Sequence, residues 1–421
     1  MARTIGLCTH ADCTGCTACQ TVCPVNVIEM REDACGFLYP EIDAEKCVRC
    51  GACAAVVQKL ANHMQEDEHH ESPIQYYAVK LKDDTQRMNS QSGGLFYAMA
   101  ESVIQRNGVV YGCAYVEDFH VAHIRVETVT ELQRLRGSKY VQSEMGDCFS
   151  LVAKDLQNNK YVLFSGTPCQ CAGIEAYLQQ KKINTDCFFS CDVICHGVPS
   201  PGAFGKYLAF MEQKFGAKAE SINLRDKKTA DWHTPVEKLS FMNGKTYTGG
   251  IWSECFYSCL MFRQSCENCR YTNLNRPSDI TIGDCWGIEK EYPDLWNDEK
   301  GISVAIIQTF KGLNLFRMAE AKIDTQALVS YTQPQLCHSS PVPKQKQRFW
   351  TDYQKLDFED LLKKYTSYGG LKLKYLPRRF PTSHKVHSWV VWRITSEKRL
   401  TRKFSTHASS WIVQRVREPN R

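Results

Sequence analysis

Seven cysteines near the N-terminus constrain this chain more than any other feature. Four follow the pattern Cys-x2-Cys-x2-Cys-x3-Cys-Pro, and three more repeat the Cys-x2-Cys-x2-Cys triplet. They are Cys13, Cys16, Cys19 and Cys23, followed by Cys47, Cys50 and Cys53. A loop with this spacing presents three thiolates to one iron–sulfur cluster, and the cysteine before proline reaches the other cluster of the pair. The pattern therefore predicts two such clusters close to the N-terminus.

Zinc and disulfide bonds explain these cysteines less well. Zinc is satisfied by four ligands, which leaves two triplets and a Cys-Pro step unexplained. Disulfide frameworks are typical of short secreted chains, whereas this chain has 421 residues, 22 cysteines and no apolar signal core at its start. No stretch approaches the ~20 apolar residues of a membrane-spanning helix. We therefore expect a cytoplasmic protein that uses its cysteines to bind metal.

The second triplet lacks the fourth cysteine that the pattern requires, because position 57 holds Val57. By cross-ligation, Cys23 still completes the cluster held by the second triplet. The cluster of the first triplet is left with three thiolates. Three outcomes stay open: a three-iron cluster, a substitute thiol from Cys8 or Cys35, or a labile or empty site.

Composition and hydrophobic pattern divide the rest of the chain. We expect an α+β ferredoxin-like module at residues 1–61, a polar linker at 62–75, a larger α/β (mixed α+β) domain at 76–345 and a short basic helical tail at 346–421. The large domain falls into two parts, 76–150 and 151–345. Strands are predicted at 77–82, 109–116, 161–165, 188–194, 238–242 and 302–309, and helices at 95–106, 172–180 and 203–214.

Four cysteines of the large domain form a further candidate site. Cys169 and Cys195 each follow a predicted strand, and Cys266 and Cys269 form a Cys-x2-Cys pair. The carboxyl ends of strands are where α/β sheets place their ligands. Together the four thiols are suited to one cubane cluster, with a structural zinc as the alternative.

Seven short motifs follow one another along the chain. They are Ser90-Gln91-Ser92-Gly93-Gly94, Leu135-Arg136-Gly137-Ser138-Lys139-Tyr140-Val141-Gln142-Ser143, Phe164-Ser165-Gly166-Thr167-Pro168-Cys169-Gln170, Cys195-His196-Gly197-Val198-Pro199-Ser200-Pro201, Asn223-Leu224-Arg225-Asp226-Lys227-Lys228, Ser265-Cys266-Glu267-Asn268-Cys269 and Asn275-Arg276-Pro277-Ser278-Asp279-Ile280-Thr281-Ile282-Gly283-Asp284. In this order, over about residues 9–345, the chain resembles the beta subunit of coenzyme F-420 hydrogenases and dehydrogenases, together with bacterial relatives that stand alone or occur near polysaccharide genes. The resemblance implies FAD and iron–sulfur clusters that move electrons to or from a two-electron acceptor, and it favours the cluster over zinc at the four cysteines.

The FAD implied by this resemblance needs its pyrophosphate held by backbone amides, a helix N-terminus or a cation. Candidate residues are Ser92, Gly93 and Gly94 before a predicted helix, then Gly137, Ser138, Lys139 and Tyr140, and finally Arg225, Lys227, Arg276 and Asp279. A glycine pair before a helix also occurs as a plain turn, and an aspartate also caps turns. No catalytic acid or base is indicated.

The tail differs in charge from the rest of the chain. Residues 371–421 hold 13 Lys or Arg and two acids, a net charge of +11, so residues 1–370 sum to −5. Three tryptophans stand among these charges: Trp389, Trp392 and Trp411. A cationic surface with aromatic anchors suits the inner face of an anionic membrane; a protein partner or a solvated surface are the alternatives. No nucleic-acid motif accompanies the charge, so nucleic acid is not expected as a partner.

We interpret the chain as an FAD- and iron–sulfur-dependent oxidoreductase. It would relay electrons from a one-electron donor, either a redox protein or a small-molecule reductant, through 4Fe-4S clusters to FAD and a two-electron acceptor. An iron–sulfur carrier subunit that docks on a catalytic partner is one alternative. A zinc-stabilised interaction protein is the other.

Overall fold

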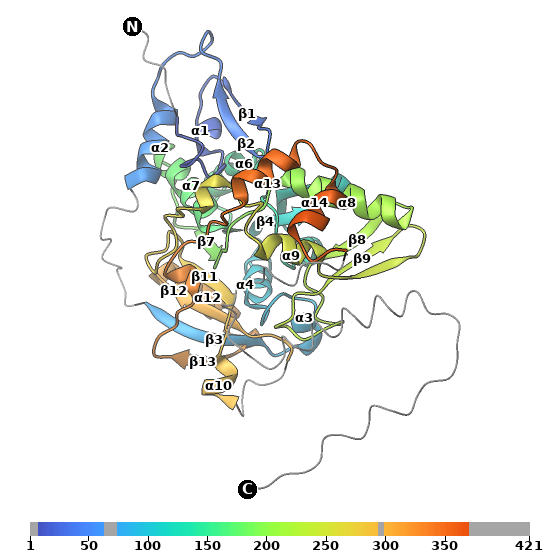
Figure 1. The fold of residues 1–421 in the computed structure, drawn as a ribbon. Helices are drawn as coiled ribbons and strands as arrows, with labels where there is room; N and C mark the ends of the chain where they lie inside the picture. Colours follow the sequence, from blue (N-terminus) through green and yellow to red (C-terminus); the bar gives the residue numbers. More distant parts are fainter. Residues whose placement is uncertain (1–6, 63–73, 294–298, 370–421) are drawn as a thin grey trace. The chain divides into compact units, whose positions relative to one another are not determined.

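A computed structural model describes residues 7–62, 74–293 and 299–369 (Figure 1). Most of the predicted linker and the strongly basic part of the tail lie outside the described residues. Within the described ranges, no helix is long and apolar enough to cross a membrane.

Two short strands and two helices make up residues 7–62. They are α1 (Ala18–Thr21), β1 (Ile28–Glu32), β2 (Leu38–Ile42) and α2 (Ala52–Asn62). The strands pair antiparallel, with Met30 opposite Pro40. Each cysteine triplet runs from a loop into a helix, so that Cys19 lies in α1 and Cys53 in α2.

An eight-stranded sheet forms the centre of the larger part, in the order β13-β3-β12-β11-β7-β6-β4-β5. Its strands are β3 (Gln75–Leu81), β4 (Val109–Tyr115), β5 (Val121–Val126), β6 (Val162–Gly166), β7 (Phe188–Val193), β11 (Ile280–Asp284), β12 (Ser303–Ile307) and β13 (Ile323–Leu328). The four strands β4, β6, β7 and β11 run parallel to their neighbours in that group, and the remaining pairs are antiparallel. The expected mixed α/β architecture is confirmed.

Helices cover both faces of this sheet, as the alternation of side chains along its strands requires. Val110 and Leu163 face one core with α4 (Leu95–Ile104) and α12 (Phe310–Ala319). The opposite core contains Val109 and Val162 with α6 (Cys148–Gln157) and α7 (Pro168–Gln180). The N-terminal module packs into this second core through Ala18 and Val56. Shorter helices around this sheet include α3 (Asp84–Met88), α5 (Val129–Leu132) and α10 (Ile288–Glu291).

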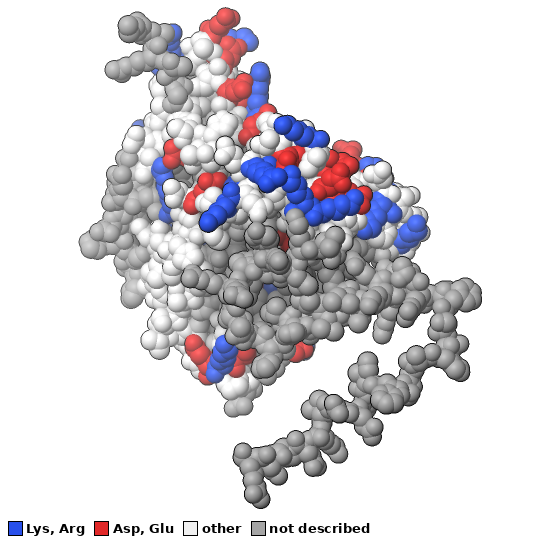
Figure 2. Space-filling model, viewed as in Figure 1, with Lys and Arg blue, Asp and Glu red and all other residues white. Residues whose placement is uncertain are grey.

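A third core lies beside a smaller antiparallel sheet of order β10-β9-β8. Its elements are β8 (Ala219–Asn223), β9 (Glu237–Phe241), β10 (Thr246–Gly249), α8 (Pro201–Phe215), α9 (Ile251–Tyr257), α13 (Lys346–Tyr353) and α14 (Phe358–Tyr365). Phe349 and Leu361 are buried in it, so the described start of the predicted tail packs with the large domain. On the face in Figure 2, basic and acidic side chains lie side by side over this region, and Lys363 pairs with Glu359 at 3.3 Å.

Candidate functional site

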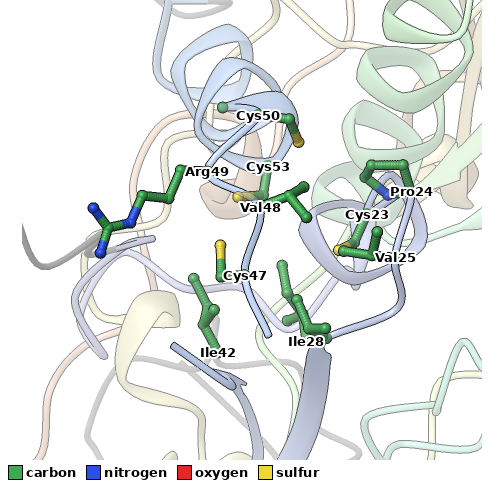
Figure 3. Close-up of a pocket in the computed structure, with 12 residues that line it drawn as sticks. Cys23, Pro24, Val25, Ile28, Ile42, Cys47, Val48, Arg49, Cys50 and Cys53 are labelled. Atoms are coloured by element: carbon green, nitrogen blue, oxygen red, sulfur yellow. The ribbon is translucent and has the colours of Figure 1, made fainter. Parts of the chain in front are cut away.

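The second triplet and Cys23 line one pocket, which we call the outer site (Figure 3). Cys23 follows α1, whereas Cys47, Cys50 and Cys53 come from the loop before α2 and from its first turn. Apolar side chains complete the lining, among them Ile28, Ile42, Val25 and Val48. The structure therefore brings Cys23 to the second triplet, as cross-ligation between the two triplets requires.

The first triplet forms the inner site, and all three of its cysteines are at most 8% exposed. The Cys19 thiol interacts electrostatically with Cys16 and Cys13, so the three sulfurs share one small region. Burial raises the pKa of Cys19, because a thiolate loses its hydration there. A hydrogen bond from Cys8, assisted by the Arg263 guanidinium, outweighs burial at Cys13 and lowers its pKa to about 6.

Arg263 is a fully buried cation beside the inner site. Its guanidinium donates hydrogen bonds to the carbonyl oxygens of Cys13 at 2.7 Å and Leu38 at 2.9 Å. The same group lies 3.5 Å from the Cys13 sulfur and 4.0 Å from the centre of the Tyr39 ring. It is thus placed to compensate negative charge on thiolates at this site. Arg263 was not predicted as a site residue, and its only local signal is a cation three positions before Cys266.

The four cysteines of the large domain meet at one edge of the main sheet, and we call them the sheet site. Cys195 follows β7, and Cys169 lies in the first turn of α7, directly after β6. Because β6 and β7 run parallel, both residues lie at the same edge. The Cys169 thiol interacts electrostatically with Cys269, Cys195 and Cys266, so all four predicted ligands are brought together.

Polar groups surround the sulfurs of the sheet site. The Thr167 hydroxyl lies 3.1 Å from the Cys169 sulfur, and the Gly197 amide donates to Cys195 at 3.4 Å. Burial raises the pKa of Cys195 to about 12 and that of Cys266 to about 11. Buried thiols with these pKa values become thiolates only with a cation or metal beside them.

The inner site and the sheet site are adjacent. Cys16 packs directly on Gly173 of α7, where an added Cβ would lie 2.8 Å from the Cys16 Cβ and 3.1 Å from its sulfur. Gly173 is four residues after Cys169 on the same helix, hence one turn further on. Tyr271 interacts electrostatically with Cys169, Cys16 and Cys269, which places this side chain between the two sites. Neither Gly173 nor Tyr271 was predicted as a site residue.

A polar cavity of about 260 Å³ brings together several of the predicted flavin residues. Gly137, Ser138, Lys139 and Arg225 all contribute to its lining. The wall also contains Ser90, Gln91, Tyr115, Arg136, Asn223 and Asp226. In the described part of the chain, three buried polar atoms of this wall have no hydrogen-bond partner: Gln91 Nε2, Tyr115 Oη and Arg136 Nε. Buried groups of this kind call for a partner that the protein itself does not supply, and a phosphate-bearing ligand fits these donors.

Arg225 links this cavity to the sheet site. Its guanidinium pairs with Asp284 at 2.6 Å and lies 3.3 Å from the Tyr140 hydroxyl. His196, the residue after Cys195, interacts electrostatically with Asp284 and Arg225. Arg225 of the cavity wall therefore lies near His196, the residue next to Cys195.

The other predicted flavin residues make contacts inside the protein and are not part of the cavity lining. A Cβ on Gly93 would lie 2.2 Å from the Val79 carbonyl oxygen, so this glycine permits close packing on β3. Lys227 donates hydrogen bonds to the carbonyls of Arg87 and Ser92 at 2.7 and 2.9 Å. Gly94 begins α4 with a positive φ of 85°.

Two further candidates belong to buried pairs near the end of β7. Arg276 and Asp192 form an ion pair of 2.7 Å, and both side chains are at most 1% exposed. Asp279 accepts hydrogen bonds from the Ser190 amide at 2.9 Å and the Thr309 hydroxyl at 2.6 Å. As flavin ligands, these residues stay predictions.

Within residues 7–62, 74–293 and 299–369, no group of three or more His, Cys, Asp and Glu side chains is placed to hold a single metal ion. A cubane cluster needs a different arrangement of thiolates, because each thiolate binds a separate iron.

Residues 159–330 match the family described as the C terminus of the coenzyme F420 hydrogenase/dehydrogenase beta subunit, and residues 12–56 match the 4Fe-4S dicluster domain. The large domain therefore carries the C-terminal domain of coenzyme F420 hydrogenase/dehydrogenase beta subunits. The resemblance seen in its motifs is thereby confirmed, and its N-terminal module is a 4Fe-4S dicluster domain.

The chain is similar to the F subunit of the F(420)H(2) dehydrogenase of Methanosarcina mazei, with 21% identity over 68% of this chain and 78% of the relative. A shorter match of 49 residues is 45% identical to the B subunit of the ion-translocating oxidoreductase complex of Methanosarcina acetivorans, covering 12% of this chain and 17% of that protein. One chain of a solved structure, the F420-reducing NiFe hydrogenase complex of Methanosarcina barkeri, is similar with a TM-score of 0.41 and 13% identity, over 73% of this chain and 97% of that chain.

Proposed function

We propose that this protein is an iron–sulfur flavoprotein that relays electrons from a one-electron donor through three 4Fe-4S clusters to FAD and a two-electron acceptor. The observation that carries the proposal is the spatial series of its sites. The outer site, the inner site, the sheet site and the polar cavity follow one another, and Gly173 and Arg225 mark two of the junctions. The coarser part, an iron–sulfur protein of an oxidoreductase family, follows from the two matched domains.

The outer site is suited to receive electrons from a partner protein. Cys50 is exposed, and the neighbouring Val25 and Val48 are 42% and 59% exposed although they are apolar. An apolar surface around a redox centre lets a partner approach closely. The relative of the N-terminal module whose name refers to a complex is consistent with a protein donor.

The cavity residues would hold FAD by its phosphates. The terminal nitrogens of Arg136 donate to Gln86, Gln133 and Ser90, so that Arg136 adds positive charge to the wall together with Lys139 and Arg225. Ser138 adds a hydroxyl, and Gln91 Nε2 and Arg136 Nε are the N–H groups without a partner. Burial lowers the pKa of Lys139 to about 8, so at neutral pH its ammonium is charged. It donates hydrogen bonds to the carbonyls of Arg134, Arg136 and Gly137, so it would act on the phosphates through its charge. FAD, when bound, supplies the exchange between single electrons and electron pairs. The relative named for coenzyme F420 makes a deazaflavin the first acceptor to test.

Anaerobic purification tests the proposal directly, with iron, acid-labile sulfide, zinc and extracted flavin measured on one sample. Three cubanes and one flavin predict about twelve irons, about twelve sulfides and about one FAD per chain. Iron and sulfide without flavin would favour a carrier subunit, and zinc without sulfide would contradict the redox function.

A matched pair of variants tests the cavity. Arg136→Gln removes a guanidinium with an unpartnered Nε and is expected to lower FAD occupancy about tenfold or more. Arg134→Gln changes an exposed arginine two residues away and should leave flavin content unchanged. Equal flavin content in the two variants would place FAD elsewhere.

A further inference from the structure

The inner site lacks a ligand at the position where the motif would supply one. Val57 lies within α2, and the helix continues without proline to Asn62. The extended helix packs against α7 of the large domain. At position 57, where the motif has its fourth cysteine, this chain has a helical valine in the helix that docks the module. A 4Fe-4S cluster at the inner site therefore needs a sulfur from another residue.

Cys8 supplies a thiol at this place. It donates a hydrogen bond to the Cys13 sulfur and also interacts electrostatically with Cys19 and Cys16. Cys8 therefore lies close to all three thiols of the inner site. Every described cysteine is free, so this proximity is not a disulfide.

The local backbone explains how a residue five positions before Cys13 returns to the site. The amides of Asp12 and Cys13 both donate to the Thr9 carbonyl, at 3.1 and 2.9 Å, which closes a single turn. The Thr9 hydroxyl bonds to Asp12 at 2.6 Å, and Asp12 pairs with Arg270 at 2.8 Å. Arg270 follows Cys269, so the turn that presents Cys8 is tied to the segment of the sheet site.

Cys35, the other spare cysteine, has different surroundings. It packs against the cluster of Cys13, Phe37 and Tyr39. Its thiol interacts electrostatically with Asp33, Lys346, Tyr39 and Tyr353. Its carbonyl accepts a hydrogen bond from Ser200 at 2.5 Å, which holds this turn against the start of α8. Cys35 thus borders the inner site at Cys13, from a turn that is fixed to α8, whereas Cys8 interacts with all three thiols.

We propose that Cys8 is the fourth ligand of the inner 4Fe-4S cluster, in place of the cysteine missing at position 57. The inner site then holds four thiolates around a buried centre, with Arg263 beside them as a compensating cation. This inference rests on the clusters of the proposed function and is independent of FAD.

Replacing Cys8 and Cys35 separately tests this assignment. In Cys8→Ala, we expect loss of about one iron per chain with sulfide unchanged, and the electron paramagnetic resonance signal of an oxidised three-iron cluster. Loss of the whole inner cluster, about four irons, would equally support the assignment if Cys35→Ala retains full iron. Full iron in Cys8→Ala, or iron loss in Cys35→Ala instead, would overturn it.

Alkylation of the wild-type protein provides a second test that needs no variant. Cys8 and Cys337 are both exposed. Because the hydrogen bond to Cys13 raises the pKa of Cys8 and slows its alkylation, iodoacetamide is applied under identical conditions before and after iron removal. In the anaerobic iron-loaded protein, peptide mass mapping is expected to show Cys337 modified and Cys8 protected. Removal of iron with a chelator should then expose Cys8. Equal modification before iron removal would overturn the assignment, whereas absence of flavin from the same sample would contradict only the proposed function.

Discussion

The inner and outer sites have nearly the same local sequence but opposite surroundings. Each triplet runs from a loop into a helix, yet Cys50 of the outer site is exposed while the inner cysteines are buried. The outer site has apolar neighbours that reach the solvent, and the inner site has α7, Tyr271 and Arg263. The repeated motif therefore specifies the cysteine ligands. Docking on the large domain determines whether a site is surrounded by protein or by solvent.

This difference has an electrostatic consequence. Burying a charged cluster costs free energy because its hydration is lost, and a buried cation at short range offsets part of that cost. Arg263 provides the offset at the inner site, while water can provide it at the outer site. We infer that the inner site is built to exchange electrons within the chain and the outer site with a partner.

The largest effect on electron transfer is expected from removing the sheet site, which would accept electrons from the inner site. Cys169→Ser should abolish the cluster of the sheet site, lowering iron by about four per chain. Both N-terminal clusters should remain reducible by dithionite, but their electrons should no longer reach FAD. Iron analysis and anaerobic flavin spectra check this.

Cys171→Ser is the matched control for that variant. Cys171 is also buried in α7, and its thiol contacts the Cys191 carbonyl at 3.7 Å, away from the four ligands. Iron content and flavin reduction should both stay at the wild-type level. If Cys169→Ser behaved like Cys171→Ser, the sheet site would not hold a cluster.

A smaller effect is expected when the contact between the inner site and α7 is forced apart. Gly173→Ala places a methyl group against Cys16 and should destabilise the protein by about 1–3 kcal/mol through overpacking. Thermal unfolding and stopped-flow reduction of the flavin measure stability and electron transfer separately.

Gly205 of α8 offers the comparison, because nothing lies within 4 Å of a Cβ added there. Gly205→Ala should leave both stability and transfer rate intact or slightly raise stability. A Gly173→Ala protein with unchanged stability and transfer rate would show that the inner site does not depend on this close approach.

Removing the buried cation tests the electrostatic argument. Arg263→Gln should make the inner cluster harder to reduce, by about 2 kcal/mol, since the reduced cluster loses a nearby positive charge. The outer cluster should keep its potential. Redox titration followed by electron paramagnetic resonance resolves the two.

Arg31→Gln is the control, because Arg31 of β1 pairs with Glu29 at 3.1 Å and is 62% exposed, so that water screens its charge. Its inner-cluster potential should change little. Equal shifts in the two variants would mean that Arg263 acts through general charge alone.

The sequence predicted those parts of the sites whose geometry is local. The spacing of the seven N-terminal cysteines encodes two loops, and Cys169 and Cys195 were expected at strand ends that β6 and β7 do bring to one edge. Residues contributed by distant segments gave no such signal. Arg263 meets Cys13 across 250 positions, and only the folded chain reveals that contact.

Glycine illustrates a second limit of the sequence. Ser92-Gly93-Gly94 before a helix predicted a phosphate loop, and in the structure Gly93 lies against the backbone of β3. A missing side chain permits close approach by a ligand and by a strand alike, so the motif predicts closeness without identifying the neighbour. Gln91 lies in this motif and Arg136 in the next one along the chain. Only their unpartnered atoms in the structure distinguish them as candidate ligand-binding residues.

The smallest expected effect is a pH dependence of FAD affinity at the polar cavity, which lies at the opposite end of the series from the outer site. Burial lowers the pKa of Lys139 from 10.5 to about 8, while the nearby Cys113 acts weakly in the opposite direction. Phosphate binds the protonated amine better, so FAD affinity should be full below pH 8. Above that pH it should fall, by at most about tenfold per pH unit.

Without FAD, the stability of the folded protein should change with pH in the opposite direction from FAD affinity. Burying the charged amine costs stability below pH 8, and the cost is relieved as the pH rises from about 8 towards 10.5, because only the unfolded chain still holds the proton. Lys139→Arg keeps its charge and should bind FAD with no pH dependence in this range. Flavin titrations between pH 7 and 10 on both proteins compare them directly, and a parallel decline in both would assign the titration to another group.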